Sequence, residues 1–172
     1  MITAVDVLHV LDLLGAADVP VWVDGGWGVD ALLGEQTRPH DDLDLALEHR
    51  DLAQFLHVMG DACFRLLRDD GPFNRVLVDE AGRKVDYHVF DASATRRTET
   101  GVTVYGPKGL EYEVGAFDGQ GAILGRPVPC CTADFQVKSH AGYELDDDDL
   151  RDVEALHRRF GVPLLPEHKR AR

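Results

Sequence analysis

The chain has 172 residues, of which 44% are hydrophobic and 28% are charged, and its 31 acidic against 18 basic residues give a formal net charge of −13 at pH 7. This composition predicts a globular protein with a sizeable core, and the excess of acids argues against binding to a nucleic-acid backbone, which needs clustered Lys and Arg. No apolar run approaches the roughly 20 residues that span a bilayer, and residues 1–15 lack the pattern of a signal peptide, so we expect no membrane partner and a cytoplasmic location.

The first half of the chain alternates between helical and extended patterns. In chain order, apolar spacing and turn residues predict a helix over 3–16, a strand over 20–23, a helix over 27–33, a strand over 43–47, a helix over 51–60 and strands over 63–67, 73–79 and 83–90. Thr3 is the expected N-cap of the first helix and Gly15 its end, while Gly34 is expected to end the second helix.

The second half begins with short β-like pieces and ends in helices. The pieces at 102–105, 113–114 and 122–124 alternate with Gly and Pro, which predicts hairpins and loops, and helices follow over 132–140 and 148–160. The expected fold is α/β (α+β), a mixed central sheet flanked by helices. We expect one domain over 1–172, with a catalytic sheet core over 1–91, a β and loop segment over 92–129 and a helical C-terminal part over 130–172.

Three minor features have simple explanations. The three cysteines, Cys63, Cys130 and Cys131, show no C-x-x-C spacing, which argues against a disulfide framework or a zinc site. The acidic run at 146–149 is expected to cap a helix and to complement its dipole. The basic tail at 168–172 is expected to be a solvated end.

Two glycines and two aspartates carry the strongest chemical signal. Gly25 and Gly26 lie between a strand and a helix, where the missing Cβ lets a phosphate approach backbone N–H groups and where a helix N-terminus favours anions. Asp42 and Asp44 share one face of a strand whose other face carries leucines. Adjacent carboxylates repel each other unless a cation lies between them, and Mg²⁺ takes oxygen ligands while leaving positions for phosphates. This combination predicts chemistry on a nucleotide.

Asp86 is the third candidate carboxylate. It shares one face of the strand over 83–90 with His88. If that strand lies near the one with Asp42 and Asp44, three carboxylates converge. Two would hold a metal against the triphosphate, and the third would either ligate the metal or take the proton from an attacking hydroxyl. The alternative is that Asp86 is simply the exposed residue of an alternating strand.

Three cationic side chains are candidates for contact with the nucleotide. Arg38 could form a forked hydrogen bond with phosphate, or only an ion pair with nearby acids. His40 could contact phosphate or orient an aspartate, and we favour the second role. Lys138, on the expected helix 132–140, could reach the β- and γ-phosphates as a point charge, although a lone lysine on a helix is usually only solvated.

These motifs together resemble the DNA polymerase beta-like nucleotidyltransferase superfamily. Residues 24–30, Asp-Gly-Gly-Trp-Gly-Val-Asp, and residues 40–44, His-Asp-Asp-Leu-Asp, look most like the lincosamide nucleotidyltransferases and next like the aminoglycoside 2″-nucleotidyltransferases. Residues 85–88 and 140–145, with Asp152, also look like the lincosamide group. The resemblance implies a polymerase beta-like fold and Mg²⁺-dependent transfer of a nucleoside monophosphate, usually AMP from ATP, to a drug hydroxyl, with release of pyrophosphate.

The resemblance also implies roles for individual residues. Asp42 and Asp44 become metal ligands, Asp86 becomes the third ligand or the base, and Gly25 with Gly26 becomes the phosphate-binding turn. It favours functional roles for Asp86 and for Lys138 over the simpler alternatives.

The acceptor is the least constrained part of this prediction. The segment over 92–129 does not match the family, and we expect the acceptor pocket there. We expect the acceptor to be a small cationic antibiotic, a lincosamide first and an aminoglycoside second, because the acidic chain would attract a cation. The alternative is an antitoxin or a protein-modifying (AMPylating) regulator on the same fold. The sequence leaves open whether the chain forms a homodimer.

Overall fold

The computed structural model describes residues 1–169, and its strands are short segments that lie between Val21 and Cys130. The described strands are β1 (Val21–Asp24), β2 (Asp42–Glu48), β3 (Arg65–Asp69), β4 (Asn74–Val78), β5 (Lys84–Phe90), β6 (Thr95–Arg97), β7 (Thr103–Tyr105), β8 (Gly119–Ile123) and β9 (Arg126–Cys130). The described helices are α1 (Ala4–Ala16), α2 (Gly25–Leu33), α3 (Leu52–Asp61), α4 (Ala133–Ser139) and α5 (Asp147–Phe160), with 3-10 turns at His49–Asp51 and Pro166–His168. None of the helices within residues 1–169 has the length and apolar composition needed to cross a bilayer.

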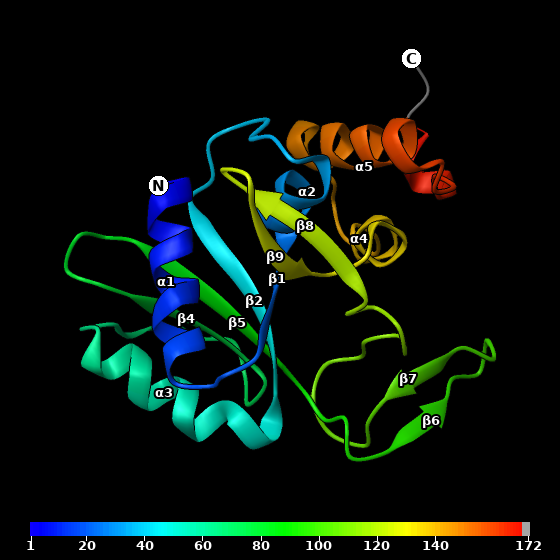
Figure 1. Cartoon of the computed structure of the whole chain (residues 1–172). Coiled ribbons are helices and arrows are strands. Elements are labelled where there is room, and N and C mark those ends of the chain that lie inside the picture. Colours follow the sequence, from blue (N-terminus) through cyan, green and yellow to red (C-terminus); the bar gives the residue numbers. More distant parts are fainter. Residues whose placement is uncertain (170–172) are drawn as a thin grey trace.

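A mixed seven-stranded sheet organises these described elements in the order β3-β4-β5-β2-β1-β9-β8 (Figure 1). At its centre β2 runs antiparallel to β1 and parallel to β5, and β6 pairs with β7 as a separate hairpin. The prediction of a mixed sheet flanked by helices is therefore confirmed. The sheet also extends beyond the segment 1–91, because β8 and β9 join it beside β1.

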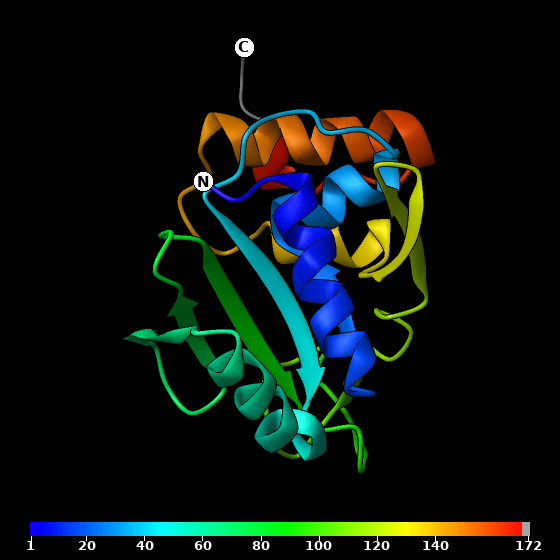
Figure 2. The same ribbon diagram turned by 60° about the vertical axis from the view of Figure 1, so that its left-hand side comes forward.

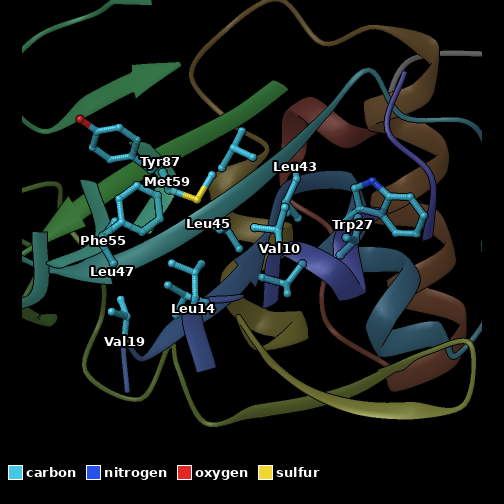
Figure 3. Close-up of a cluster of buried hydrophobic side chains, with 14 of the residues drawn as sticks. Val10, Leu14, Val19, Trp27, Leu43, Leu45, Leu47, Phe55, Met59 and Tyr87 are labelled. Carbon is cyan, nitrogen blue, oxygen red and sulfur yellow. The ribbon is translucent and has the colours of Figure 1, made fainter. Parts of the chain in front are cut away.

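One face of the sheet is apolar and packs against α1 and α3 (Figures 1 and 2). Alternation along β2 directs three leucines, which are 0% exposed, into this layer, where Leu14 of α1 and Phe55 of α3 belong to the same cluster (Figure 3). Burying one such side chain contributes about 1.5–3 kcal/mol, so this layer supplies much of the stability. The leucines are Leu43, Leu45 and Leu47.

The other face of the sheet is divided between an aromatic part and a polar part. A second cluster packs Phe90, Tyr112 and Phe117 around Ala46, with the rings of Phe90 and Phe117 stacked 4.2 Å apart. A third cluster joins α2, α4 and α5 through Val29 and buried residues of both C-terminal helices. Figure 1 shows these three helices together at one end of the sheet. They form a wall beside the polar part.

The start of α2 differs from the prediction. The helix begins at Gly25 rather than at residue 27, because the Asp24 carboxylate accepts the Gly25 N–H at 2.9 Å and caps the helix there. The two glycines are thus the first residues of the helix rather than a turn ahead of it. Its predicted end is confirmed, since Gly34 adopts the left-handed conformation with φ 79°. At the first helix, Thr3 is the N-cap as predicted, but α1 continues through Gly15 to Ala16.

β9 is a strand that the proline-rich sequence did not predict. It contains Pro127 and Pro129, yet it pairs with β8 along its length. On its other side it meets β1 only where Val23 lies opposite Cys130. Proline has no backbone N–H to donate. At 127 and 129 this costs little stability, because no strand pairs with β9 there on the β1 side and no hydrogen bond is lost.

The C-terminal tail is also less solvated than expected. His168 is buried, with 4% exposed, and its ring hydrogen-bonds to the backbone. Of the predicted basic tail, residues 170–172 lie outside the described residues.

Candidate active site

Strand register brings three aspartates into one row across the polar face. Asp24 lies opposite Asp44 in the β1–β2 pair, and Asp44 lies opposite Asp86 in the β2–β5 pair. Asp42 lies two residues before Asp44 on the same face, and His88 lies two residues after Asp86. The adjacency that the sequence could only suppose, between the Asp42–Asp44 strand and the Asp86 strand, is therefore present.

Asp44, Asp86 and His88 form a compact group of potential metal ligands. One ligand atom from each lies within 4.8 Å of the other two. The Nε2 atom of His88 is 3.6 Å from Asp44 Oδ1 and 3.8 Å from Asp86 Oδ1. Asp86 Oδ1 is buried and has no hydrogen-bond partner. A buried carboxylate oxygen without a partner, next to a second carboxylate, fits a cation with a preference for oxygen ligands. Asp42 lies outside this group.

The pKa values of these groups reflect burial and crowded negative charge. Burial, opposed by His88 and supported by the charge of Asp44, raises the pKa of Asp86 to about 6. Burial and then the charge of Asp44 raise the pKa of Asp42. Burial would lower the pKa of His88, but hydrogen bonding and the charge of Asp44 raise it above its ordinary value. The cluster therefore favours positive charge beside Asp44.

The two glycines allow the start of α2 to touch the site side chains. Gly25 has φ 55°, and a Cβ atom there would lie 2.2 Å from Asp44 Oδ2. A Cβ atom on Gly26 would lie 2.5 Å from His40 Nδ1 and 2.8 Å from Arg38 Nη2. Any larger residue would displace a carboxylate, an imidazole or a guanidinium, so the close approach that the glycine pair predicts is a feature of the fold.

Arg38 is held by a buried carboxylate. Its Nη2 donates to Asp152 Oδ2 at 2.8 Å, and the Asp152 side chain is only 4% exposed. Burial would lower the pKa of Arg38, but this bond to Asp152 raises it above its ordinary value. The guanidinium is therefore a fixed, fully charged group between the loop before β2 and α5.

His40 is held in the same way. Its Nε2 lies 2.5 Å from Asp30 Oδ2, which makes Asp30 the aspartate partner that the sequence favoured for His40. The other oxygen of Asp30 accepts the backbone N–H and the hydroxyl of Thr37 at 2.9 and 2.6 Å. Asp30 thus ties the loop before β2 to α2.

A cavity of about 590 Å³, called here the first cavity, opens beside these groups. Its acidic lining includes Asp24 of β1 and Asp42 and Asp44 of β2, whereas Asp86 of β5 does not line it. An anion entering such a cavity needs a cation to offset the carboxylates. The lining residues are Asp24, Gly25, Gly26, Arg38, Pro39, His40, Asp41, Asp42, Asp44, His88, Ser139, His140, Tyr143, Asp148 and Asp149.

Lys138 does not line the first cavity. Its ammonium pairs with Asp134 at 2.6 Å and with Glu113 at 2.9 Å, and its side chain lines a second cavity of about 300 Å³. This second cavity lies between the β6–β7 hairpin and α4, and the two cavities share Ser139 in their linings. The role of Lys138 as a phosphate contact stays a prediction.

Several residues of the first cavity were not selected from the sequence. Asp24 precedes the glycine pair, where an N-cap is expected, and that position was the available signal. His140 and Tyr143 follow α4, and the Tyr143 hydroxyl donates to Asp149 at 3.2 Å. The C-terminal segment supports this loop, because the ring of His168 lies 2.5 Å from the His140 carbonyl oxygen. The resemblance of residues 140–145 to the lincosamide group was the available signal for His140 and Tyr143, because no spacing rule connects segments that meet only after folding.

Comparisons with known sequences agree with this geometry. The family model of aminoglycoside-2″-adenylyltransferase matches residues 6–156. This match includes the segment 92–129, so the expectation that this segment does not match the family was wrong. A lincosamide resistance protein of Staphylococcus haemolyticus is 26% identical over 156 residues, which cover 90% of this chain and 94% of that protein. A 2″-aminoglycoside nucleotidyltransferase of Klebsiella pneumoniae is 50% identical over 46 residues, which cover 25% of each chain.

Solved structures extend the comparison to the fold. The lincomycin-bound lincosamide antibiotic adenylyltransferase LnuA aligns with a TM-score of 0.75 and 25% identity, over 90% of this chain and 96% of that chain. ANT(2″)-Ia in complex with adenylyl-2″-tobramycin aligns with a TM-score of 0.67 and 17% identity, over 90% and 87% of the two chains, a likeness that concerns the fold alone. The resemblance and the fold predicted from the sequence are confirmed.

Proposed function

This chain belongs to the aminoglycoside-2″-adenylyltransferase family, which confirms the prediction of a nucleotidyltransferase enzyme, and we propose a specific reaction for it. It transfers a nucleoside monophosphate, AMP from ATP, to a hydroxyl of a small cationic antibiotic and releases pyrophosphate. The acceptor is a lincosamide first and an aminoglycoside second. The lincosamide ranks first because the likeness to the lincosamide resistance protein runs along most of the chain, whereas the aminoglycoside match covers a short segment.

One observation carries this proposal. The carboxylates of Asp44 and Asp86 lie in register on neighbouring strands, and Asp44 meets the N-terminal glycine of a helix at the wall of a large cavity. A helix N-terminus attracts phosphate, and adjacent carboxylates attract a cation. A metal–nucleotide complex supplies both partners at once, which neither an anion nor a cation alone would do.

Phosphate binding falls to groups that the fold already holds in place. Arg38, fixed by Asp152, presents guanidinium donors to phosphate oxygens, and the start of α2 adds backbone N–H groups. Asp42 and Asp44 would hold Mg²⁺, with the carboxylate of Asp86 beside them on the neighbouring strand. When bound, the ion would neutralise phosphate charge and make the α-phosphorus more electrophilic. His40 has a supporting role in the wall of the first cavity, because its bond with Asp30 keeps the loop before β2 in position.

Asp86 is the proposed base. Its carboxylate, whose pKa is raised to about 6 by burial, takes the proton of the acceptor hydroxyl. The hydroxyl oxygen then forms a bond to the α-phosphorus while the bond from that phosphorus to the bridging oxygen of the β-phosphate breaks. Pyrophosphate leaves with the electron pair of that bond. Burial of Asp86 keeps bulk water from competing for the carboxylate.

The acceptor is assigned to the segment 92–129, which supplies much of the second cavity. That cavity adjoins the first one at Ser139, so an acceptor bound there could present a hydroxyl to the nucleotide. Because the reaction consumes a nucleoside triphosphate, the cytoplasm is the proposed location.

Product analysis tests this function. The protein is incubated with Mg²⁺, each nucleoside triphosphate in turn, and lincomycin, tobramycin and related compounds, and product masses are recorded. We expect one compound to gain a single AMP group with ATP and nothing to change when the metal is chelated. If no compound of either class is modified with any nucleotide, while a purified protein is, the antibiotic assignment is wrong.

A further inference from the structure

The second cavity contains charges that the proposed reaction does not use. It lies between the β6–β7 hairpin and α4, and apolar side chains such as Val104 and Phe135 form part of its lining. Two carboxylates, from Glu111 and Glu113, also line it. Glu111 pairs with Arg96 of the hairpin, and Glu113 pairs with Lys138 of α4.

Lys138 occupies the centre of a three-charge arrangement. Its ammonium lies 2.9 Å from Glu113 Oε2 and 2.6 Å from Asp134 Oδ2, and only Glu113 of these two acids lines the cavity. The Lys138 and Glu113 side chains are 42% and 31% exposed, so a ligand in the cavity can reach both. Lys138 can keep its bond to Asp134 when Glu113 takes another partner.

We infer that Glu113 binds the ammonium group of the acceptor, in competition with the ammonium of Lys138, so that this pair sets the selectivity of the second cavity for cationic compounds. The inference rests on the proposed function and assigns the recognition of charge to two named residues. In the absence of an acceptor, the ammonium of Lys138 occupies the position beside Glu113 that the acceptor amine would take. The apolar lining would contact the rest of the compound.

Opposite effects of the two charges distinguish this role from a structural ion pair. Replacing Glu113 by glutamine removes the anion that an acceptor amine needs, so binding weakens. Replacing Lys138 by glutamine removes a competing cation, so binding strengthens. If the pair only held the hairpin against α4, either change would loosen the cavity, and both would weaken binding.

Calorimetric titration of the nucleotide-free protein with tobramycin and with lincomycin, both amine-bearing, measures these effects. We expect E113Q to raise the Kd and K138Q to lower it, each by about three- to fivefold for partly exposed charges. Both changes should shrink in 1 M salt, where the Debye length is about 3 Å. The matched control is E80Q, which removes the same charge from an exposed site before β5, at the end away from the hairpin.

Three outcomes overturn the inference: weaker binding in both variants, no change in either, or no saturable binding of either compound to the wild-type protein. If K138Q instead raises the KM for ATP and leaves the Kd of the acceptor unchanged, Lys138 is a phosphate contact, as first predicted. Product mass from the wild-type protein tests the proposed function separately. Antibiotic modification with unchanged Kd values in both variants would refute this inference alone.

Discussion

The two faces of strand β2 share one backbone, but their side chains have different roles: one face is part of the hydrophobic core and the other lines the candidate site. On one face Leu43, Leu45 and Leu47 are fully buried against α1 and α3. On the other face Asp42 and Asp44 are half-buried beside the first cavity. Alternation along one strand therefore separates stability from chemistry at neighbouring positions.

The comparison extends to the strands beside β2. β5 repeats the division, with Val85 and Tyr87 in the core and Asp86 beside Asp44. The carboxylates on the polar face repel one another, and nearby cationic side chains such as His88 offset this repulsion only in part. We expect substitutions on the polar face to affect turnover and substitutions on the apolar face to affect unfolding.

Asp44→Ala should have the largest effect and should fall on turnover alone. Loss of this carboxylate removes a metal ligand, and such a loss is expected to slow nucleotidyl transfer by about a thousandfold or more, since metal stabilisation is commonly worth several kcal/mol. The melting temperature should stay the same or rise, because one repelling charge is gone. Steady-state rates and thermal unfolding measure both. Asp61→Ala, at an exposed position on α3, serves as the control; a near wild-type rate for Asp44→Ala would contradict the metal assignment.

Leu45→Ala should show the reverse pattern. Truncating a fully buried leucine should lower the free energy of unfolding by about 2–5 kcal/mol. The folded fraction should keep a turnover rate near that of the wild type at low temperature. Urea unfolding followed by circular dichroism gives the free energy.

The matched control is Leu66→Ala on β3, where the side chain is 52% exposed and the cost should be about 0.5 kcal/mol or less. Equal destabilisation by the two changes would break the comparison, since it would mean that the apolar face of the sheet does not dominate stability.

Asp86→Asn sharpens the comparison within the polar face. If Asp86 is the base, transfer should slow by about a hundredfold while the affinity for Mg²⁺ and nucleotide changes little. A binding titration beside a single-turnover rate separates these quantities. A fall in affinity that matches the fall in rate would show that Asp86 acts chiefly as a ligand.

Asp6→Asn should have the smallest effect, on the helix that covers the apolar face. Hydrogen bonds from Thr3 and then Arg83 lower the pKa of Asp6 to about 2, against about 4 in an unfolded chain. A lowered pKa stabilises the fold above pH 4, and that contribution disappears as the pH falls from about 4 to about 2.

The variant should therefore lose about 1 kcal/mol at pH 7, the usual cost of a lost cap, and clearly less at pH 2, where about half of the folded molecules already carry a protonated Asp6. Urea unfolding at the two pH values measures the difference. A deficit that persists unchanged at pH 2 would contradict this account of the capping box.

Local patterns predicted much of this molecule because their causes are local. Alternation placed the leucines and aspartates of β2 on opposite faces, and Gly34 marked the end of α2. The pairing of β2 with β5 could only be supposed from the sequence, since strand neighbours are set by tertiary packing. β9 was missed because prolines indicate loops, and only its one-sided pairing makes them harmless.

The candidate site shows the same difference between features with local causes and features set by tertiary packing. Asp42, Asp44 and Asp86 stood out because acids on apolar strands are unusual, and the glycine pair stood out by its position. Asp152 supports Arg38 across 114 positions of sequence, a contact that no spacing indicates. Lys138 was assigned to phosphate by resemblance, and its two carboxylate partners become visible only when the segment 92–129 folds against α4.

Thermal unfolding with and without Mg²⁺ and a non-hydrolysable ATP analogue tests most directly whether the polar face of β2 binds the metal–nucleotide complex. A ligand at about 100 times its Kd stabilises a fold by about 2.7 kcal/mol. We predict that the complex raises the melting temperature of the wild type and of Leu45→Ala by similar amounts, and that it leaves Asp44→Ala unchanged. An equal rise in Asp44→Ala, or an equal rise in the wild type without metal, would contradict the account.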